Sequence, residues 1–268
     1  MTEKGALMTF GEHLDALRRM LFRIMGVTLV LGVTIFCLKD ATFRLLLAPT
    51  DSGFVTWRWL DALGRRLGTD LGAGAFRIEL ISTELAAQFK THVATSAGLA
   101  LLAASPYIVF ELFRFVAPAL YAAERRRSRW VVAGVYVLFA MGVAVSYYVV
   151  FPISLRFLGT YQVAPGVTNQ INLSSYISMF TRLTFLMGLV FQLPVAVLFM
   201  ARMGLVSAAL LRRYRRHAIL LICIVAAVIT PPDALSLVLV ATPMCLLYEV
   251  SLRLAGMAEH RKHDTGRR

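Results

Sequence analysis

Six apolar runs alternate with polar segments along the chain, at about 20–38, 92–113, 130–151, 177–201, 218–230 and 234–252. Because a transmembrane α-helix needs about 20 mostly apolar residues, the pattern predicts an all-α membrane protein with six transmembrane helices. The last two helices are expected to be short, since Ala218 to Ile229 allows only about 18 Å of helix. Either the bilayer thins beside them, or the fifth helix continues through Arg215. We expect residues 1–268 to form a single integral membrane domain.

Composition agrees with this pattern. Hydrophobic residues make up 58% of the chain and charged residues 16%, with a mean hydropathy of +0.69. Soluble domains carry about 25% charged residues, so a soluble enzyme is excluded. A net charge of +13 would suggest nucleic acid in a soluble protein, but in a membrane protein loop charge first reports topology. We therefore expect contact with a lipid bilayer and none with nucleic acid.

The distribution of basic residues predicts the orientation. The N-terminal segment, 114–129, 202–216 and 253–268 carry 19 of the 28 Lys and Arg residues, and the segments expected on the other side carry eight. Since cytoplasmic loops are enriched in Lys and Arg, both termini are expected to be cytoplasmic. The first run resembles a signal peptide, but no small-x-small cleavage site follows it, so we expect a retained span.

Two long segments are expected on the outer side. Residues 54–67 contain Trp57 and Trp59, and their apolar side chains at helical spacing are Phe54, Trp57, Leu60, Leu63 and Leu67. This indicates an amphipathic helix, either anchored in the outer interface by tryptophan or acting as an ordinary cap of the bundle. Residues 152–175 contain Pro152, Pro165 and Gly166, and their composition indicates a loop.

Groups for covalent or metal chemistry are not arranged in any known pattern. Cys37, Cys223 and Cys245 all lie in apolar runs without a CxxC motif, and the five histidines are scattered. We therefore expect no disulfide framework, metal site or cofactor. With no nucleophile and base at matching depth, the chain is not expected to be an enzyme.

The informative residues are polar groups within or beside the apolar runs, where such groups are costly. Glu124 is the acid of an otherwise basic loop, and it either neutralises nearby arginines or receives an incoming guanidinium. Gln192 lies mid-span, where its side chain either forms a hydrogen bond to a neighbouring helix or faces a polar cavity. Asp233 follows two prolines and is placed to cap the sixth helix.

Several motifs occur in a specific order: HLDALRR, PALYAAERR, a Val150–Pro152 VFP, FQLP and TPPD. From about Phe10 to Glu249 the chain resembles the TatC family, the multi-spanning subunit of the twin-arginine protein translocase. The resemblance implies a core subunit in the bacterial cytoplasmic membrane that binds twin-arginine signal peptides of folded precursor proteins. It also implies homo- and hetero-oligomers with single-span TatA/TatB-type partners, and export driven by the proton gradient.

The resemblance also implies roles for individual residues. The signal-peptide site would contain Glu124 as a main contact for the twin arginines, with Arg18, Phe115, Leu120, Arg125 and Arg126. Gln192 matches a polar site within the fourth span, and Thr230 and Asp233 lie where partners would dock. The matching structural prolines are Pro49, Pro106 and Pro118.

The chain departs from the family pattern at two informative positions. Ala16 stands where the family usually has Glu, so Glu12 or Asp15 is the candidate replacement carboxylate, and Leu237 stands where Gln is usual. The alternative function is a secondary transporter of a small anion, using Arg182 and Gln192 at depth. Absence of an internal repeat in the sequence weighs against that alternative.

Overall fold

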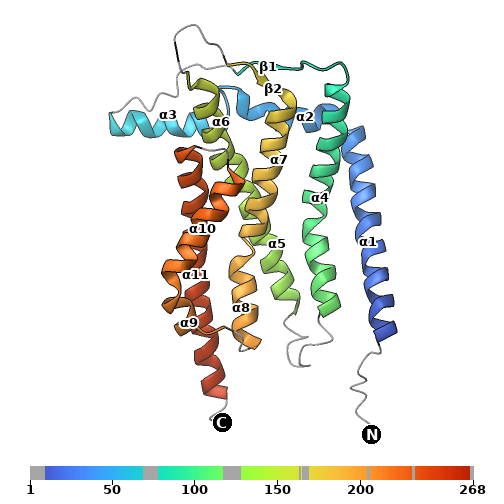
Figure 1. Ribbon diagram of the computed structural model, residues 1–268, viewed down its shortest axis with the longest axis vertical. Helices are drawn as coiled ribbons and strands as arrows, with labels where there is room; N and C mark the ends of the chain where they lie inside the picture. Colours follow the sequence, from blue (N-terminus) through green and yellow to red (C-terminus); the bar gives the residue numbers. More distant parts are fainter. Residues whose placement is uncertain are drawn as a thin grey trace. The chain divides into compact units, whose positions relative to one another are not determined.

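The computed structural model describes residues 10–68, 78–116, 128–162, 164, 169–203, 206–230 and 233–265. The described part is almost wholly helical (Figure 1). In chain order, its elements are α1 (Phe10–Cys37), α2 (Lys39–Leu47), η1 (Ala48–Thr50), α3 (Val55–Leu67), β1 (Leu80–Ile81), α4 (Ala87–Val116), α5 (Ser128–Val145), η4 (Ser146–Val150), α6 (Phe151–Thr160), β2 (Ile171–Asn172), α7 (Leu173–Val190), α8 (Leu193–Met203), α9 (Ala208–Arg213), α10 (Arg215–Ile229) and α11 (Ala234–Thr265).

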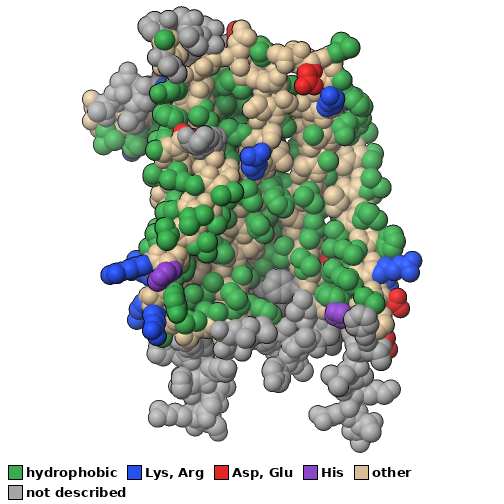
Figure 2. Space-filling model, in the orientation of Figure 1, with side chains coloured by type: hydrophobic (Ala, Val, Ile, Leu, Met, Phe, Trp, Pro, Cys, Tyr) green, Lys and Arg blue, Asp and Glu red, His purple; other side chains and the backbone are tan. Residues whose placement is uncertain are grey.

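Five stretches of the described helices are long and apolar enough to cross a membrane. They are Gly11–Cys37, Ala87–Leu112, Ala133–Thr160, Leu173–Ala201 and Ala234–Met257. Figure 2 shows hydrophobic side chains over the middle of the visible helices, with most of the charged side chains toward their ends. This distribution is that of a helical membrane protein. The predicted fifth span corresponds to α10, which has 15 residues, so six spans remain a prediction.

The expectation that both C-terminal helices are short holds for α10 and is wrong for α11. The helix α11 has 32 residues and continues well past Glu249. Its polar residues are paired there: Arg215 Nε lies 2.8 Å from Glu249 Oε1, and the Tyr248 hydroxyl donates to the Leu211 carbonyl at 2.7 Å. Tyr and Glu are compatible with a helix interior, and here their polar groups are satisfied within the protein.

Contacts divide the chain into two compact units, residues 1–39 with 92–135 and residues 40–91 with 136–268. In the first unit, α1 is the most exposed helix, and Met20 is its buried hydrophobic residue. The helices α1 and α4 pack together at Gly32, where a Cβ would be in van der Waals contact with that of Ala100 at 3.5 Å.

The second unit contains a close helix crossing at two glycines. A Cβ on Gly142 of α5 would lie 2.7 Å from the Met187 carbonyl oxygen of α7, and one on Gly188 would lie 2.6 Å from the Phe139 ring. Only a residue without a side chain allows this approach, which is a common device of membrane helices.

Residues 152–175 are not the loop that the sequence indicated. The helix continues from α5 through a π-helical turn, η4, into α6, and β2 then pairs in parallel with β1. Pro152 stands in the first turn of α6, where proline is tolerated. Pro152 offers no N–H to the Tyr148 carbonyl one turn earlier, but the Thr56 hydroxyl donates to that oxygen. Side-chain satisfaction of the carbonyl therefore lets the helix continue.

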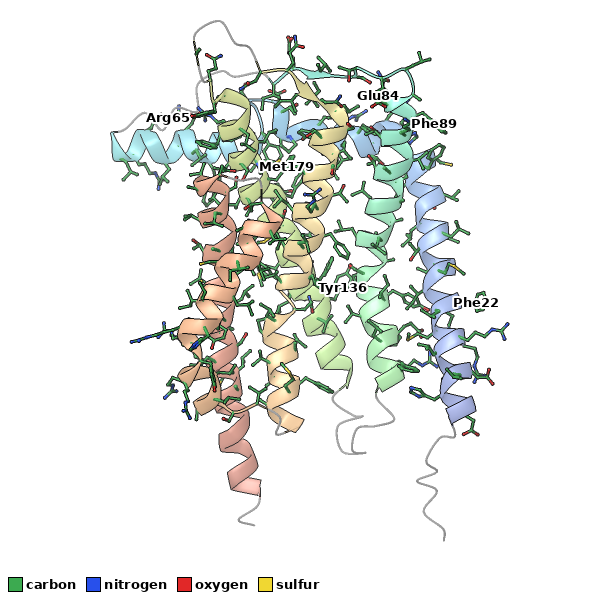
Figure 3. The ribbon with its side chains drawn as sticks, viewed as in Figure 1. Phe22, Arg65, Glu84, Phe89, Tyr136 and Met179 are labelled. Carbon is green, nitrogen blue, oxygen red and sulfur yellow. The ribbon has the colours of Figure 1, made fainter. Side chains whose placement is uncertain are left out.

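The predicted amphipathic helix is α3, and it runs across the long helices of its unit (Figure 1). Its two tryptophans have opposite surroundings: Trp57 is buried under the guanidinium of Arg156, 5.2 Å from the ring centroid, and Trp59 is 79% exposed. Arg65 projects from the same helix (Figure 3). The buried face of α3, with Trp57, thus caps the helices of its unit, and anchoring of Trp59 in the outer interface stays a prediction.

Candidate functional site

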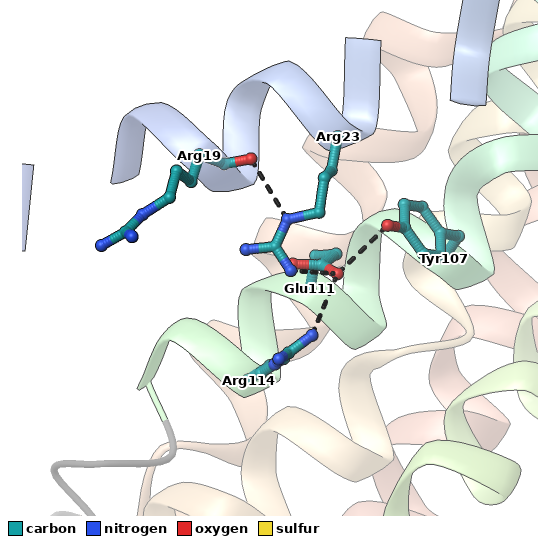
Figure 4. A network of polar contacts seen from close by, with 5 residues as sticks. All are labelled: Arg19, Arg23, Tyr107, Glu111 and Arg114. Carbon is teal, nitrogen blue, oxygen red and sulfur yellow. Dashed lines mark hydrogen bonds and ion pairs between the residues drawn. The ribbon is translucent and has the colours of Figure 1, made fainter. Parts of the chain in front are cut away.

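The most concentrated polar contacts of the first unit surround Glu111 near the end of α4 (Figure 4). Its side chain is 4% exposed. Its Oε1 accepts a hydrogen bond from the Tyr107 hydroxyl at 3.1 Å and lies 3.5 Å from Arg23 Nη1 and 3.8 Å from Arg114 Nη1. A buried carboxylate is tolerated when it is paired in this way. The cluster therefore ties α4 to α1.

Helical spacing assembles the cluster. Tyr107, Glu111 and Arg114 lie at i, i+4 and i+7 of α4, so they share one face. On α1, the Arg19 Nε donates to the Asp15 carbonyl at 3.3 Å, and the Arg23 Nε donates to the Arg19 carbonyl at 3.2 Å. Each guanidinium is thereby held along its own helix, and Arg23 Nη1 lies beside Glu111 (Figure 4).

A hollow of about 320 Å³ adjoins this cluster, and it brings two sequence motifs together. Its lining is formed by His13, Ala16, Arg19, Met20, Arg23, Glu111, Arg114 and Phe115. The His13 and Phe115 rings have centroids 4.5 Å apart. The HLDALRR motif therefore contacts Phe115, which stands three residues before the PALYAAERR motif. Ala16, which departs from the family pattern, lines this hollow together with three arginines and one glutamate.

The structure locates only part of the predicted signal-peptide site. Glu124, Leu120, Arg125, Arg126 and Pro118 lie outside the described residues. Phe115 lines the hollow with Ala16. Arg18 lies in a neighbouring hollow on α1 with Asp15, and its guanidinium stands 5.6 Å from the centroid of the Phe22 ring.

Two of the structural prolines are described. Pro49 is buried, and its carbonyl accepts from the Trp57 indole at 3.5 Å. Pro106 lies inside α4, where it leaves the Leu102 carbonyl without its usual backbone donor. The Ser105 hydroxyl donates to that carbonyl at 2.6 Å, so α4 continues through the proline.

Gln192 lies at a break in the fourth predicted span. It is half-buried between α7 and α8, and its backbone N–H donates to the Leu189 carbonyl at 3.0 Å. Pro194, two residues later, interrupts the regular ladder. Arg182, which an anion transporter would place at the same site, is exposed on α7 about 15 Å away along the axis. The structure therefore does not bring these two residues together.

The turn between α10 and α11 matches the predicted capping role of Asp233. Its Oδ1 accepts from the Ser236 backbone N–H at 2.6 Å, at the start of α11. Thr230 is buried, and its hydroxyl donates to the Ala226 carbonyl at 2.9 Å. Both side chains thus stabilise helix ends, and a docking role for this turn stays a prediction.

Sequence reasoning assigned no role to Glu111 and missed its partners. The available signal was an acid inside the second apolar run combined with Arg23 inside the first, since charges at that depth are usually paired. Within the described ranges, no group of three or more His, Cys, Asp or Glu residues is placed to hold a metal ion.

Comparisons with known proteins give a consistent result. A family model described as Sec-independent protein translocase protein (TatC) matches residues 12–243. A TatC of Blattabacterium is 29% identical, and the match covers 95% of this chain and 97% of that protein. A TatC of Halothiobacillus neapolitanus is 32% identical, and the match covers 99% of this chain and 69% of that protein. A crystal structure of the twin-arginine translocase receptor TatC is similar over 92% of this chain and 100% of its own, with a TM-score of 0.73 and 26% identity.

Proposed function

Because the chain belongs to the TatC family of Sec-independent protein translocase proteins, we propose that it is the receptor subunit of a twin-arginine translocase. In this role it binds the twin-arginine signal peptides of folded precursor proteins at its cytoplasmic face. The observation that carries the proposal is the meeting of the His13–Arg19 motif with Phe115. Residues about 100 positions apart in the sequence form one surface there.

Charge indicates which carboxylate recognises the incoming arginines. Glu111 is already neutralised by two arginines of its own chain, so it offers little attraction to another guanidinium. Glu124, nine residues after Phe115 in the sequence, is the acid assigned to the twin arginines. A bidentate, charge-assisted pair at such a site contributes about 2–3 kcal/mol. Arg18, Leu120, Arg125 and Arg126 complete the proposed site, and Phe115 shapes it.

The C-terminal helices are the proposed docking region for single-span partner subunits. Leu220, Ile224 and Val228 form an exposed apolar row on α10, at 61%, 53% and 78% exposure. Thr230 and Asp233 mark the end of this row. A single-span helix packing along this row would bury these side chains, and van der Waals packing of this kind drives helix association in membranes.

The proposed topology has six spans, with both termini cytoplasmic and the protein in the bacterial cytoplasmic membrane. Signal-peptide binding then occurs on the side with most of the basic residues. Anionic lipid headgroups offset part of the positive electrostatic potential of those basic residues. Transport by the assembled complex uses the proton gradient, and this chain supplies binding and assembly rather than covalent chemistry.

Peptide binding to the purified full-length protein in lipid nanodiscs tests the proposal. A fluorescent signal peptide with Arg-Arg should bind more tightly than its Lys-Lys counterpart, because lysine keeps the charge but loses the planar fork. Glu124→Gln should abolish the preference for Arg-Arg. Gln192→Leu is the control within the membrane, and it should leave binding intact. Equal binding of both peptides by the unaltered protein would refute a twin-arginine receptor.

A further inference from the structure

An apolar groove runs along the surface of α1 and α4. Its volume is about 1060 Å³. Small residues, Gly32, Ala97 and Ala100, form part of its lining, together with longer side chains such as Leu21 and Leu29. From Leu14 to Phe36 the groove follows about 33 Å of α1, close to the hydrocarbon thickness of a bilayer, about 30 Å. A surface this apolar must be covered by lipid chains or by another helix.

The groove ends at a strongly basic hollow. Arg18 and Phe22 line both the groove and a hollow of about 540 Å³, whose other residues are Asp15, Arg19 and Arg23. Arg23 is paired with Glu111, which leaves Arg18 and Arg19 against one aspartate and favours a negatively charged occupant. Apolar and cationic surfaces are therefore continuous along α1, and an occupant that fills both must be an amphiphile with an anionic end.

The arginines are held in position for an anion. The Nε atoms of Arg19 and Arg23 donate to backbone carbonyls of α1, and Arg18 lies against the Phe22 ring, which projects from α1 (Figure 3). Among the described residues, Arg18 and Arg19 have no carboxylate within 4.0 Å. Their terminal nitrogens match the oxygens of a phosphate group, which guanidinium binds in a bidentate manner.

We propose that the α1–α4 groove binds a phospholipid with a net negative headgroup. The phosphate lies on Arg18 and Arg19, and one acyl chain follows the groove toward Leu29, about 17 Å farther along α1. That length equals about one leaflet. A zwitterionic lipid brings an ammonium group, which Arg18 and Arg19 repel. A protein helix would fill the apolar part but would bring no phosphate, so the arginines favour lipid.

This proposal requires only that the chain lies in a membrane, and it does not rest on the twin-arginine proposal. The test is native mass spectrometry of the delipidated full-length protein, titrated with phosphatidylglycerol and, separately, with phosphatidylcholine. The unaltered protein should bind phosphatidylglycerol at least fivefold more tightly. Arg18→Gln combined with Arg19→Gln should reduce that affinity to the phosphatidylcholine level. Arg216→Gln, which removes an exposed arginine of α10, should leave it unchanged.

The apolar part of the site has its own pair of variants. Ala97→Phe fills the groove from an exposed position and should weaken phosphatidylglycerol binding at least threefold. Ala103→Phe, an equally large change at an exposed position of α4 outside the groove lining, should not. Equal binding of the two lipids, or binding unaffected by Ala97→Phe, would overturn the proposal. Recovery of a second protein chain in place of lipid, lost with Ala97→Phe, would assign the groove to a protein helix instead.

Discussion

The buried carboxylate of Glu111 gives the sharpest prediction about stability. Replacing it in Glu111→Leu removes the acceptor of three described donors at once: Tyr107, Arg23 and Arg114. Replacing Arg23 by Met removes one partner and leaves Glu111 with the other two. The two changes break the same contact between α1 and α4 but should differ in cost, because only the first removes the centre of the cluster.

The expected loss in the free energy of unfolding depends on how exposed the paired side chains are. The Arg23 and Arg114 side chains are 44% and 62% exposed, so each ion pair contributes about 0.2–1 kcal/mol. Arg23→Met should therefore lower the free energy of unfolding by at most about 1 kcal/mol. Loss of all hydrogen bonds and pairs to a buried carboxylate should cost about 2 kcal/mol, so Glu111→Leu is the more damaging change.

Unfolding in mixed micelles, followed by far-ultraviolet circular dichroism during titration with sodium dodecyl sulfate, measures both differences. Glu84→Leu is the matched control, because Glu84 pairs with Lys90 at 3.4 Å while both side chains are more than 60% exposed (Figure 3). That change should have almost no effect. Equal losses for Glu111→Leu and Glu84→Leu would refute the assigned importance of burial, and a gain for Glu111→Leu would show that the carboxylate is a net burden.

Two further predictions concern close packing and the departure at Ala16. Gly142→Ala should destabilise the protein by about 1–3 kcal/mol, because the new Cβ would meet the Met187 carbonyl, whereas Gly134→Ala on the same helix has open space; equal unfolding curves would contradict this. Ala16→Glu adds a carboxylate to a hollow with three arginines and should tighten twin-arginine peptide binding up to about fivefold. If Glu12 or Asp15 already supplies that carboxylate, Ala16→Glu will be silent and Glu12→Ala or Asp15→Ala will weaken binding.

The fold was predictable wherever local sequence decides the structure. Apolar runs identified the long helices, and the spacing of residues 54–67 identified α3. The errors occur where a distant residue satisfies a polar group. At α6, Thr56 donates to a carbonyl 92 residues away, and at α11, Arg215 neutralises Glu249. Periodicity contains no information about such partners.

The candidate site was predictable to a different extent. The resemblance to the TatC family implied that the HLDALRR segment and Phe115 belong to one site, and the structure places the His13 and Phe115 rings in contact. The capping role of Asp233 was confirmed as well. The cluster around Glu111 was not expected, because its carboxylate and Arg23 are 88 residues apart, and only the packing of α1 against α4 brings them together.

Two hydrogen bonds from residues far along the chain hold α2 in place, and they have a consequence for biosynthesis. The Leu45 carbonyl accepts from the Tyr147 hydroxyl at 2.7 Å, and the Leu46 carbonyl accepts from Tyr176 at 2.5 Å, across 102 and 130 residues. At about 5–20 residues per second, a ribosome needs roughly ten seconds to make that intervening chain. For most of this interval α2 has left the ribosome but lacks its final partners, so a nascent chain arrested shortly before Tyr147 should expose this segment to protease. Release of the complete chain should protect it.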